Sequence, residues 1–404
     1  MAKGTKQAAM GFIFITMLID VIGLGIIIPV VPKLLQELSG ADISEAARIG
    51  GLLAFAYAFT QFLFAPLIGN LSDQFGRRPI ILISLLFFSM DYVFLAFAPS
   101  IAWLFVGRII AGITGASISS ASAYIADIST KENKAKNFGM IGAAFGMGFI
   151  IGPVLGGVLG HYGSRVPFIA AAVLCAVNFI YGYFMLPESL PVEKRRKFDW
   201  RFANPVGALM RLKKYPQVIT LIIAVFLMYV AANAVHGNWS YFTMYKFGWD
   251  ERMVGISMGA IGLAVGLVQG GVIRWLNPKI GNAKSILLGL ILYAIGLFLF
   301  STAQHEWLMF AYLVPYCLGG IAGPAFQATI SEHVPPDEQG QIQGTLSSLN
   351  SATAIIGPLL MTNTFYYFTH DQAPFTFAGA PFLLGGLLTL VSLYFAYTNL
   401  KNKL

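Results

Sequence analysis

Charged residues are scarce in this chain. Asp, Glu, Lys and Arg together make up 11% of its 404 residues, whereas 57% of the residues are hydrophobic. Soluble domains usually carry about 25% charged residues, because charge covers their water-exposed surface. The composition therefore excludes an ordinary soluble globule of this length and predicts a protein that is surrounded by lipid.

Cysteine, metal-binding patterns and nucleotide-binding loops are also nearly absent. The two cysteines, Cys175 and Cys317, both lie in apolar runs, which leaves no disulfide framework and no cysteine metal site. No phosphate loop or Ser/His/Asp elbow is present, and the five histidines show no ligand spacing. These histidines are His161, His236, His305, His333 and His370. We expect no metal, no cofactor, no ATP-driven step and no enzymatic activity.

Long apolar stretches are what the chain does contain. About twelve of them approach the roughly 20 residues that a helix needs to cross a bilayer. They lie at 8–31, 49–70, 79–98, 101–126, 137–160, 166–186, 217–243, 252–275, 284–303, 307–330, 341–366 and 377–398. No cleavage site is associated with the first run, which we interpret as a retained helix. The sequence predicts an all-α membrane protein with twelve transmembrane helices.

The distribution of Lys and Arg predicts the orientation of these helices. The side that holds both termini has 20 of the 26 basic residues, and one more, Arg108, lies within a helix. The other side has Lys33, Arg48, Arg165, Lys246 and Arg252. Basic loops face the cytoplasm, so both termini are expected there. Topology and anionic lipid account for the net charge of +8, and we expect no nucleic-acid partner.

One long polar segment divides the chain into two sets of six predicted helices. We expect an amino-terminal half at 1–186, a cytoplasmic linker at 187–216 and a carboxyl-terminal half at 217–404. Within the linker, Asn204-Pro205 is a good helix start, and Val206, Leu209 and Met210 would share one face. The linker is thus predicted to hold an amphipathic helix on the membrane surface; the alternative is a solvated basic segment.

The two halves resemble each other at a single offset of 205 residues. Matching positions are Gly76 and Gly281, Gly115 and Gly320, Asp127 and Glu332, Gly139 and Gly344, and Gly152-Pro153 and Gly357-Pro358. Parallel six-helix repeats are related by an axis along the membrane normal, and such repeats meet at a substrate site near the midplane. The offset predicts two pseudo-symmetric halves.

Three charged residues lie deep within predicted helices. At ~1.5 Å per residue, Asp20, Asp91 and Arg108 fall at a similar depth in a ~30 Å hydrocarbon core. Intramembrane charges are costly and usually functional. We expect a carboxylate that exchanges Arg108 for a proton, with Asp20 as the first candidate and Asp91 as the second. The alternative is a static structural ion pair.

The cytoplasmic loop Gly69-Asn-Leu-Ser-Asp-Gln-Phe-Gly-Arg-Arg-Pro79 carries an acid and two arginines in a tight turn. Alternating access requires an interaction that forms in one state and breaks in the other. Arg77 and Asp127 lie on the same side of the membrane and suit this role, together with Asp73 and Gly76 of the loop. The alternative is an anchoring loop with a turn glycine.

Neutral polar residues near mid-depth are the candidates for substrate contacts. Tyr57 and Gln61 are one helical turn apart, and Asn233 and Asn350 lie in the carboxyl-terminal half, which has no intramembrane acid comparable to Asp20. Aromatic residues form 14% of the chain. A largely apolar pocket with a few polar groups suits small amphiphilic organic ligands.

The charged loop closely resembles the signature of the major facilitator superfamily. Further matches are Gly107-Arg108, Gly112 and Gly115 in the fourth run, and Gly142, Gly146, Gly148, Gly152-Pro153 and Gly156-Gly157 in the fifth. The fifth-run pattern resembles the antiporter branch. This resemblance implies that Gly152, Pro153, Gly357 and Pro358 bend helices and seal the contact between halves, whereas small residues also simply allow close packing.

A narrower resemblance is to the tetracycline efflux group of drug:proton antiporters. It rests on the run Asp20-Val-Ile-Gly-Leu-Gly25, on Gln61 and on Ser89-Met-Asp-Tyr92. The group is expected to hold a histidine and an acid where this sequence has Val265 and Tyr293. The resemblance implies proton-coupled efflux of small amphiphilic compounds, tetracycline-like drugs included, by a monomer in the lipid of a bacterial inner membrane. A proton symporter or facilitator for uptake, and a non-transporting receptor, are the alternatives.

Overall fold

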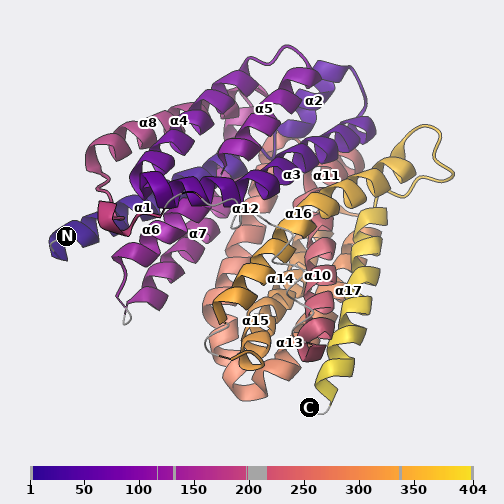
Figure 1. Cartoon of the computed structure of the whole chain (residues 1–404). Coiled ribbons are helices and arrows are strands. Elements are labelled where there is room, and N and C mark those ends of the chain that lie inside the picture. The colour runs from indigo at the N-terminus through magenta and orange to yellow at the C-terminus, as the bar shows by residue number, and fades with distance from the viewer. Residues whose placement is uncertain are drawn as a thin grey trace. The chain divides into compact units, whose positions relative to one another are not determined.

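The structure is a computed structural model of the whole chain, and it describes residues 3–115, 117–130, 133–196, 198, 216–335 and 339–401. Every regular element among these residues is helical, and none of them forms a strand. Figure 1 shows the helices, coloured from indigo at the amino terminus to yellow at the carboxyl terminus. The amphipathic helix predicted from Asn204-Pro205 lies outside the described residues.

Eight α-helices precede the linker. They are α1 (Lys3–Ile26), α2 (Val31–Ser39), α3 (Ile43–Phe75), α4 (Arg77–Ala96), α5 (Ile101–Thr114), α6 (Ser117–Ile128), α7 (Lys134–Gly160) and α8 (Val166–Met185). A short 3-10 turn, η1 (Val192–Lys194), follows them. Proline occupies the first turn of α2 and α8, where its missing N–H costs no hydrogen bond.

The helices after the linker are more often interrupted. They are α10 (Pro216–His236), α11 (Trp239–Phe247), α12 (Glu251–Leu267), α13 (Ile273–Thr302), α14 (Glu306–Leu318), α15 (Ala322–Glu332), α16 (Gln339–Thr369) and α17 (Ala380–Leu400). The π-helical segment η4 (Val268–Val272) joins α12 to α13. The 3-10 turn η5 (Gly319–Ile321) joins α14 to α15.

Most of the twelve predicted spans correspond to long apolar helices among the described residues. Nine helices or continuous helical runs are long and apolar enough to cross a membrane, and the bent pair Met10–Ile26 and Val31–Ser39 makes a tenth. The continuous run Glu251–Thr302 contains a non-helical residue at Gly281 and thus holds two spans. The 31-residue helix α16 is long enough to cross a bilayer but does not belong to this apolar set. The all-α membrane fold predicted from the sequence is confirmed.

The chain forms two compact units. Unit 1 consists of Met1–Gly40, Ala56–Asn204 and Asp250–Gly259, and unit 2 consists of Ala41–Phe55, Pro205–Trp249 and Ala260–Leu404. The first part of α3 thus packs with unit 2, and the start of α12 packs with unit 1. The boundaries 1–186, 187–216 and 217–404 stay a prediction.

The hydrophobic cores of the two units use equivalent residues of the repeat. One core cluster lies among α1, α4, α6 and α7, and the other among α10, α13, α15, α16 and α17. Core residues 205 positions apart are Ile81 and Ile286, Leu85 and Leu290, Ala121 and Phe326, Ile125 and Ile330, and Ala144 and Leu349. The internal repeat therefore describes packing as well as sequence.

Gly76 and Gly281 also share a backbone conformation. Gly76 has φ 103° and ψ 160° at the start of α4, and Gly281 has φ 78° and ψ 167° within α13. Positive φ of this kind is strained for residues with a Cβ. The glycine at each of these matched turns is therefore required by the backbone, and each marks the boundary between two spans.

Candidate functional site

A buried ion pair joins α4 and α5 in unit 1. Arg108 Nη2 lies 2.9 Å from Asp91 Oδ2, and their side chains are only 14% and 1% exposed. Gly107 permits this approach, because a Cβ at that position would lie 3.0 Å from Asp91 Oδ1. A charge pair so withdrawn from water has a high desolvation cost, which only close geometry offsets. The sequence named Asp20 as the first candidate partner of Arg108 and Asp91 as the second, and the structure shows an ion pair between Arg108 and Asp91.

Tyr57 and Gln61 of α3 lie beside this ion pair. The Arg108 Cζ atom is 5.8 Å from the centre of the Tyr57 ring. Gln61 Nε2 lies 3.1 Å from Tyr57 Oη and donates a hydrogen bond of 3.0 Å to the Gly115 carbonyl, where α5 ends. Polar groups of α3 are thereby held against the charged cluster. The role of both residues in substrate binding stays a prediction.

Asp20 of α1 belongs to the same electrostatic group. It is 7% exposed, and its side chain lies in the neighbourhood of Tyr57, as do those of Asp91 and Arg108. One turn further along α1, Gly23 approaches α4: a Cβ on it would lie 3.0 Å from Tyr92 Oη. Helices α1, α4 and α5 carry these two acids and the arginine in unit 1, and the proton-coupling role of Asp20, Asp91 and Arg108 stays a prediction.

The turn between α3 and α4 holds a second ion-pair network. Arg77 Nη1 lies 2.6 Å from Asp73 Oδ1, and Arg77 Nε lies 3.2 Å from Asp127 Oδ2 at the end of α6. Arg77 is 8% exposed although it begins α4. The distance between Arg77 and Asp127 agrees with their expected proximity, whereas the gating role of Asp73, Gly76, Arg77 and Asp127 stays a prediction.

Glu188 completes this network and was missed by the sequence analysis. Its Oε1 accepts a hydrogen bond of 2.9 Å from the backbone N–H of Arg77, and its Oε2 accepts one of 3.2 Å from that of Arg78. A carboxylate at these two N–H groups caps the start of α4 and complements the helix dipole. The capping residue lies 111 positions after Arg77, so local patterns could not reveal it.

The Gly-Pro pairs occupy contacts between the first and fifth spans of each half. In unit 1, a Cβ on Gly152 would lie 2.9 Å from the Cα of Gly25, and a Cβ on Gly25 would lie 2.9 Å from Pro153 Cδ. In unit 2, a Cβ on Gly357 would collide with the Asn233 side chain of α10. Pro153 and Pro358 lie inside continuous helices. These glycines provide close packing, while their role in bending and sealing stays a prediction.

Asn233 and Asn350 lie apart from the charged cluster, in unit 2. Asn233 Nδ2 donates to the Tyr229 carbonyl of its own helix at 2.9 Å and packs on Gly357. Asn350 is exposed on α16. Their expected role in substrate binding stays a prediction.

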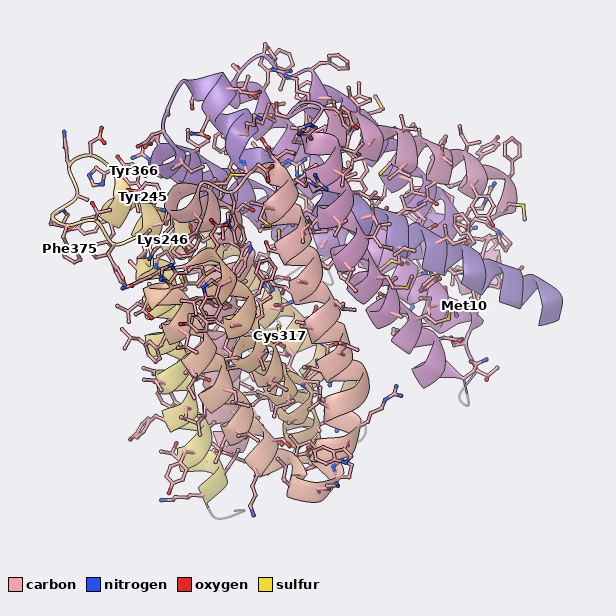
Figure 2. The ribbon with its side chains drawn as sticks, turned by 180° about the vertical axis from the view of Figure 1, so that it is seen from behind. Met10, Tyr245, Lys246, Cys317, Tyr366 and Phe375 are labelled. Atoms are coloured by element: carbon pink, nitrogen blue, oxygen red, sulfur yellow. The ribbon has the colours of Figure 1, made fainter. Side chains whose placement is uncertain are left out.

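Unit 2 contains a cavity of about 350 Å³ that neither asparagine lines. Its walls come from α10, α12, η4, α13, α14, η5 and α15. The lining residues are Met228, Tyr229, Ala232, His236, Val265, Gln269, Tyr293, Tyr316, Cys317, Gly319, Gly320, Gly323, Pro324 and Gln327. Figure 2 shows Cys317 among the helices of this unit, away from Tyr245, Lys246 and Tyr366 at its end. Such a volume, with aromatic walls and a few polar groups, is typical of small-molecule sites.

Comparison with known protein families identifies the class of protein to which the chain belongs. The profile of the Major Facilitator Superfamily matches residues 13–281 and 221–403. The chain belongs to this superfamily. Members of the Major Facilitator Superfamily are transport proteins, and this chain is accordingly an integral, multi-pass membrane transport protein.

Several curated relatives within the superfamily cover nearly the whole chain. It is 39% identical over 378 residues to the "Tetracycline resistance protein, class C" of Escherichia coli, which covers 94% of this chain and 93% of the relative. It is 34% identical over 394 residues to the class H protein of Pasteurella multocida, covering 96% of each. The "Multidrug resistance protein 2" of Bacillus subtilis (strain 168) is 30% identical over 391 residues, covering 94% of each. The resemblance to the tetracycline efflux group is confirmed.

Solved structures share the fold. The human organic anion transporter MFSD10 (TETRAN) has a TM-score of 0.72 at 24% identity and covers 97% of this chain and 99% of its own. The nucleoside transporter NupG has a TM-score of 0.75 at 14% identity and covers 98% and 99%. At these identities the similarity establishes the major facilitator fold alone.

Proposed function

We propose that this chain is a proton-coupled exporter that moves small amphiphilic organic compounds, tetracycline-like drugs among them, by alternating access. The observation that carries the proposal is the charged cluster of unit 1. It holds two acids, Asp20 and Asp91, and one arginine, Arg108, on helices that belong to a membrane transport protein.

The charge count of this cluster supports proton coupling. With both acids ionised, two carboxylates face one guanidinium, and taking up one proton removes the excess negative charge. Burial disfavours the charged form of a carboxylate, so a buried acid in such a cluster can take up a proton. Arg108 remains charged throughout, because guanidinium groups do not deprotonate in proteins.

The named relatives support export as the direction of transport. The relatives with 34–39% identity are tetracycline resistance proteins, and a further relative is a multidrug resistance protein. The 20 basic residues on the side of both termini support a cytoplasmic position for the termini. We extend the proposal to a monomer in a bacterial inner membrane that binds its substrate, protons and lipid.

The test uses inside-out membrane vesicles that contain the full chain. Respiration acidifies their interior, and an exporter then accumulates external tetracycline inside them. We expect accumulation that a protonophore abolishes and that vesicles without the protein lack. Accumulation that survives the protonophore would contradict proton coupling. Proton-dependent uptake only by right-side-out vesicles would instead favour the proton symporter.

A further inference from the structure

The cavity of unit 2 has a neutral lining with one exception. None of its described lining residues is Asp, Glu, Lys or Arg, and its polar groups are tyrosine hydroxyls, the amides of Gln269 and Gln327, and His236. The other ionisable groups are Tyr229, Tyr293, Tyr316 and Cys317. Tyrosine and cysteine are ordinarily neutral at pH 7, whereas histidine changes charge between pH 5 and 8. His236 therefore sets the charge of the cavity.

No described residue that lines the cavity beside His236 is an acid, and the acids of the wall helices α12 and α14, Glu251 and Glu306, lie in their first turns. Helices α16 and α17, which pack on α10, contain no charged residue. Helix α15 carries only Glu332, at its last residue, and α11 carries Lys246 in its last turn. His236 is exposed and ends α10 on the cavity wall. A protonated imidazole here has room for an anionic partner.

The backbone around the cavity departs from regular α-helix in two places. Gln269 lies in the π-helical segment η4, and Gly319 and Gly320 lie in the 3-10 turn η5. Such segments inside transmembrane helices frequently occur at functional sites. A Cβ on Gly320 or Gly323 would meet no atom within 4 Å, so these glycines border open space.

The walls suit a flat aromatic ligand. Tyr293 and Tyr316 stack with ring centres 4.8 Å apart, and Tyr293 Oη donates to Tyr316 Oη at 3.1 Å. Both rings line the cavity, which gives a planar guest an aromatic surface with hydroxyl groups at its edge. Methionine and proline supply further apolar contact at Met228 and Pro324.

We infer that this cavity binds planar aromatic ligands that carry an acidic group, and that His236 selects them over basic ligands of the same shape. His236 would hold the ligand's anionic oxygen, while the tyrosine pair packs on its rings. The inference rests on the proposed transport function and names its substrate class. The proton that drives transport is still assigned to the acids of unit 1, Asp20 and Asp91. Binding to the purified protein in detergent tests it separately from transport.

The experiment compares two anthracene probes of opposite charge by calorimetry on the purified full-length chain. Anthracene-9-carboxylate is anionic, and 9-(aminomethyl)anthracene is cationic, between pH 5.5 and 8. We expect the carboxylate to bind about tenfold more tightly at pH 5.5 than at pH 8, because one ionic contact is gained when His236 is protonated. The amine should bind weakly at both values. Equal affinity of the two probes at pH 5.5, or a carboxylate affinity that does not change with pH, would overturn the inference.

Four variants assign the effect to this site. His236→Gln should remove the pH dependence, and His236→Lys, which stays charged, should bind the carboxylate tightly at both pH values. His305→Gln, at an exposed position before α14, should behave as the wild type. Gly323→Leu should fill the cavity and abolish binding. Wild-type binding by Gly323→Leu, or an unchanged pH dependence in His236→Gln, would overturn the assignment, and the lysine variant decides if the glutamine variant does not fold.

Discussion

Asn282 Nδ2 donates a hydrogen bond of 3.0 Å to Glu332 Oε1, at the two positions that lie 205 residues after Arg77 and Asp127. The repeat has therefore kept the contact between the turn and the helix end, but an amide replaces the guanidinium in unit 2. A contact between an amide and a carboxylate is weaker than an ion pair with hydrogen bonding. The two halves share the geometry of this contact and differ in its strength.

Removing the charge of Asp127 should slow transport. Asp127→Asn weakens the contact with Arg77, and the loss of a charge-assisted hydrogen bond of about 1.5–3 kcal/mol changes the balance between two conformations about tenfold or more. We expect drug accumulation by inside-out vesicles to slow about tenfold, with tetracycline affinity in detergent unchanged.

The matched control is Glu332→Gln. Its amide carbonyl can still accept from Asn282, so we expect a rate within about twofold of the wild type. An equal loss of rate in both variants would show that the charge at Asp127 has no special role.

Breaking the buried ion pair of unit 1 should destabilise the protein. Asp91→Asn leaves the Arg108 guanidinium buried without its carboxylate, and the loss of one partner of a buried pair costs about 3–5 kcal/mol. Unfolding of the purified protein by denaturant measures this loss. The double variant Asp91→Asn with Arg108→Gln should recover part of it, because no unpaired charge remains. A double variant less stable than either single variant would contradict this account.

Neutralising Asp20 should uncouple the transporter. Asp20→Asn mimics one fixed protonation state, so we expect no accumulation driven by an imposed pH gradient, while exchange of labelled for unlabelled substrate continues. Reconstituted vesicles measure both rates in the same preparation. Full gradient-driven accumulation by this variant would transfer the coupling role to Asp91, and accumulation by the double Asn variant would exclude both acids.

Filling the contact between α1 and α7 should prevent folding. Gly152→Leu places a side chain where the Gly25 backbone lies, and overpacking of this kind costs about 1–3 kcal/mol or more. We expect a large loss of monodisperse protein in detergent. Gly142→Leu, on the same helix where a Cβ would meet no atom within 4 Å, should give a wild-type yield. Normal yield from Gly152→Leu would show that the helices can separate.

The sequence could predict the elements that depend on composition and local pattern. Apolar length identified the spans, and the offset of 205 located Gly76 and Gly281 at equivalent turns. The cost of buried charge identified Asp20, Asp91 and Arg108 before their proximity was known. These signals are strong because a polar or charged group that is placed in the hydrocarbon core costs free energy.

The sequence could not predict which helix faces meet. The hydrophobic runs are apolar on most sides, so they do not reveal how each helix is rotated about its axis. Gln269 also lies in the π-helical segment Val268–Val272, where the regular α-helical spacing does not predict the direction of a side chain. Asn233 appeared suited to substrate, yet its side chain packs on Gly357. His236 showed no motif, and only the fold places it in a cavity with Tyr293 and Gln327.

The direct backbone contact between Gly25 and Gly152 couples α1 rigidly to α7. The backbone of one glycine and the rigid ring of Pro153 face the other glycine, so this contact has no flexible side chain that could absorb a displacement of one helix against the other. Asp20 lies five residues before Gly25 in α1, a distance of about 7.5 Å along the helix. A movement of α1 that follows protonation of Asp20 would therefore also move α7. The displacement would be largest at the ends of the two helices, far from the carboxyl group itself.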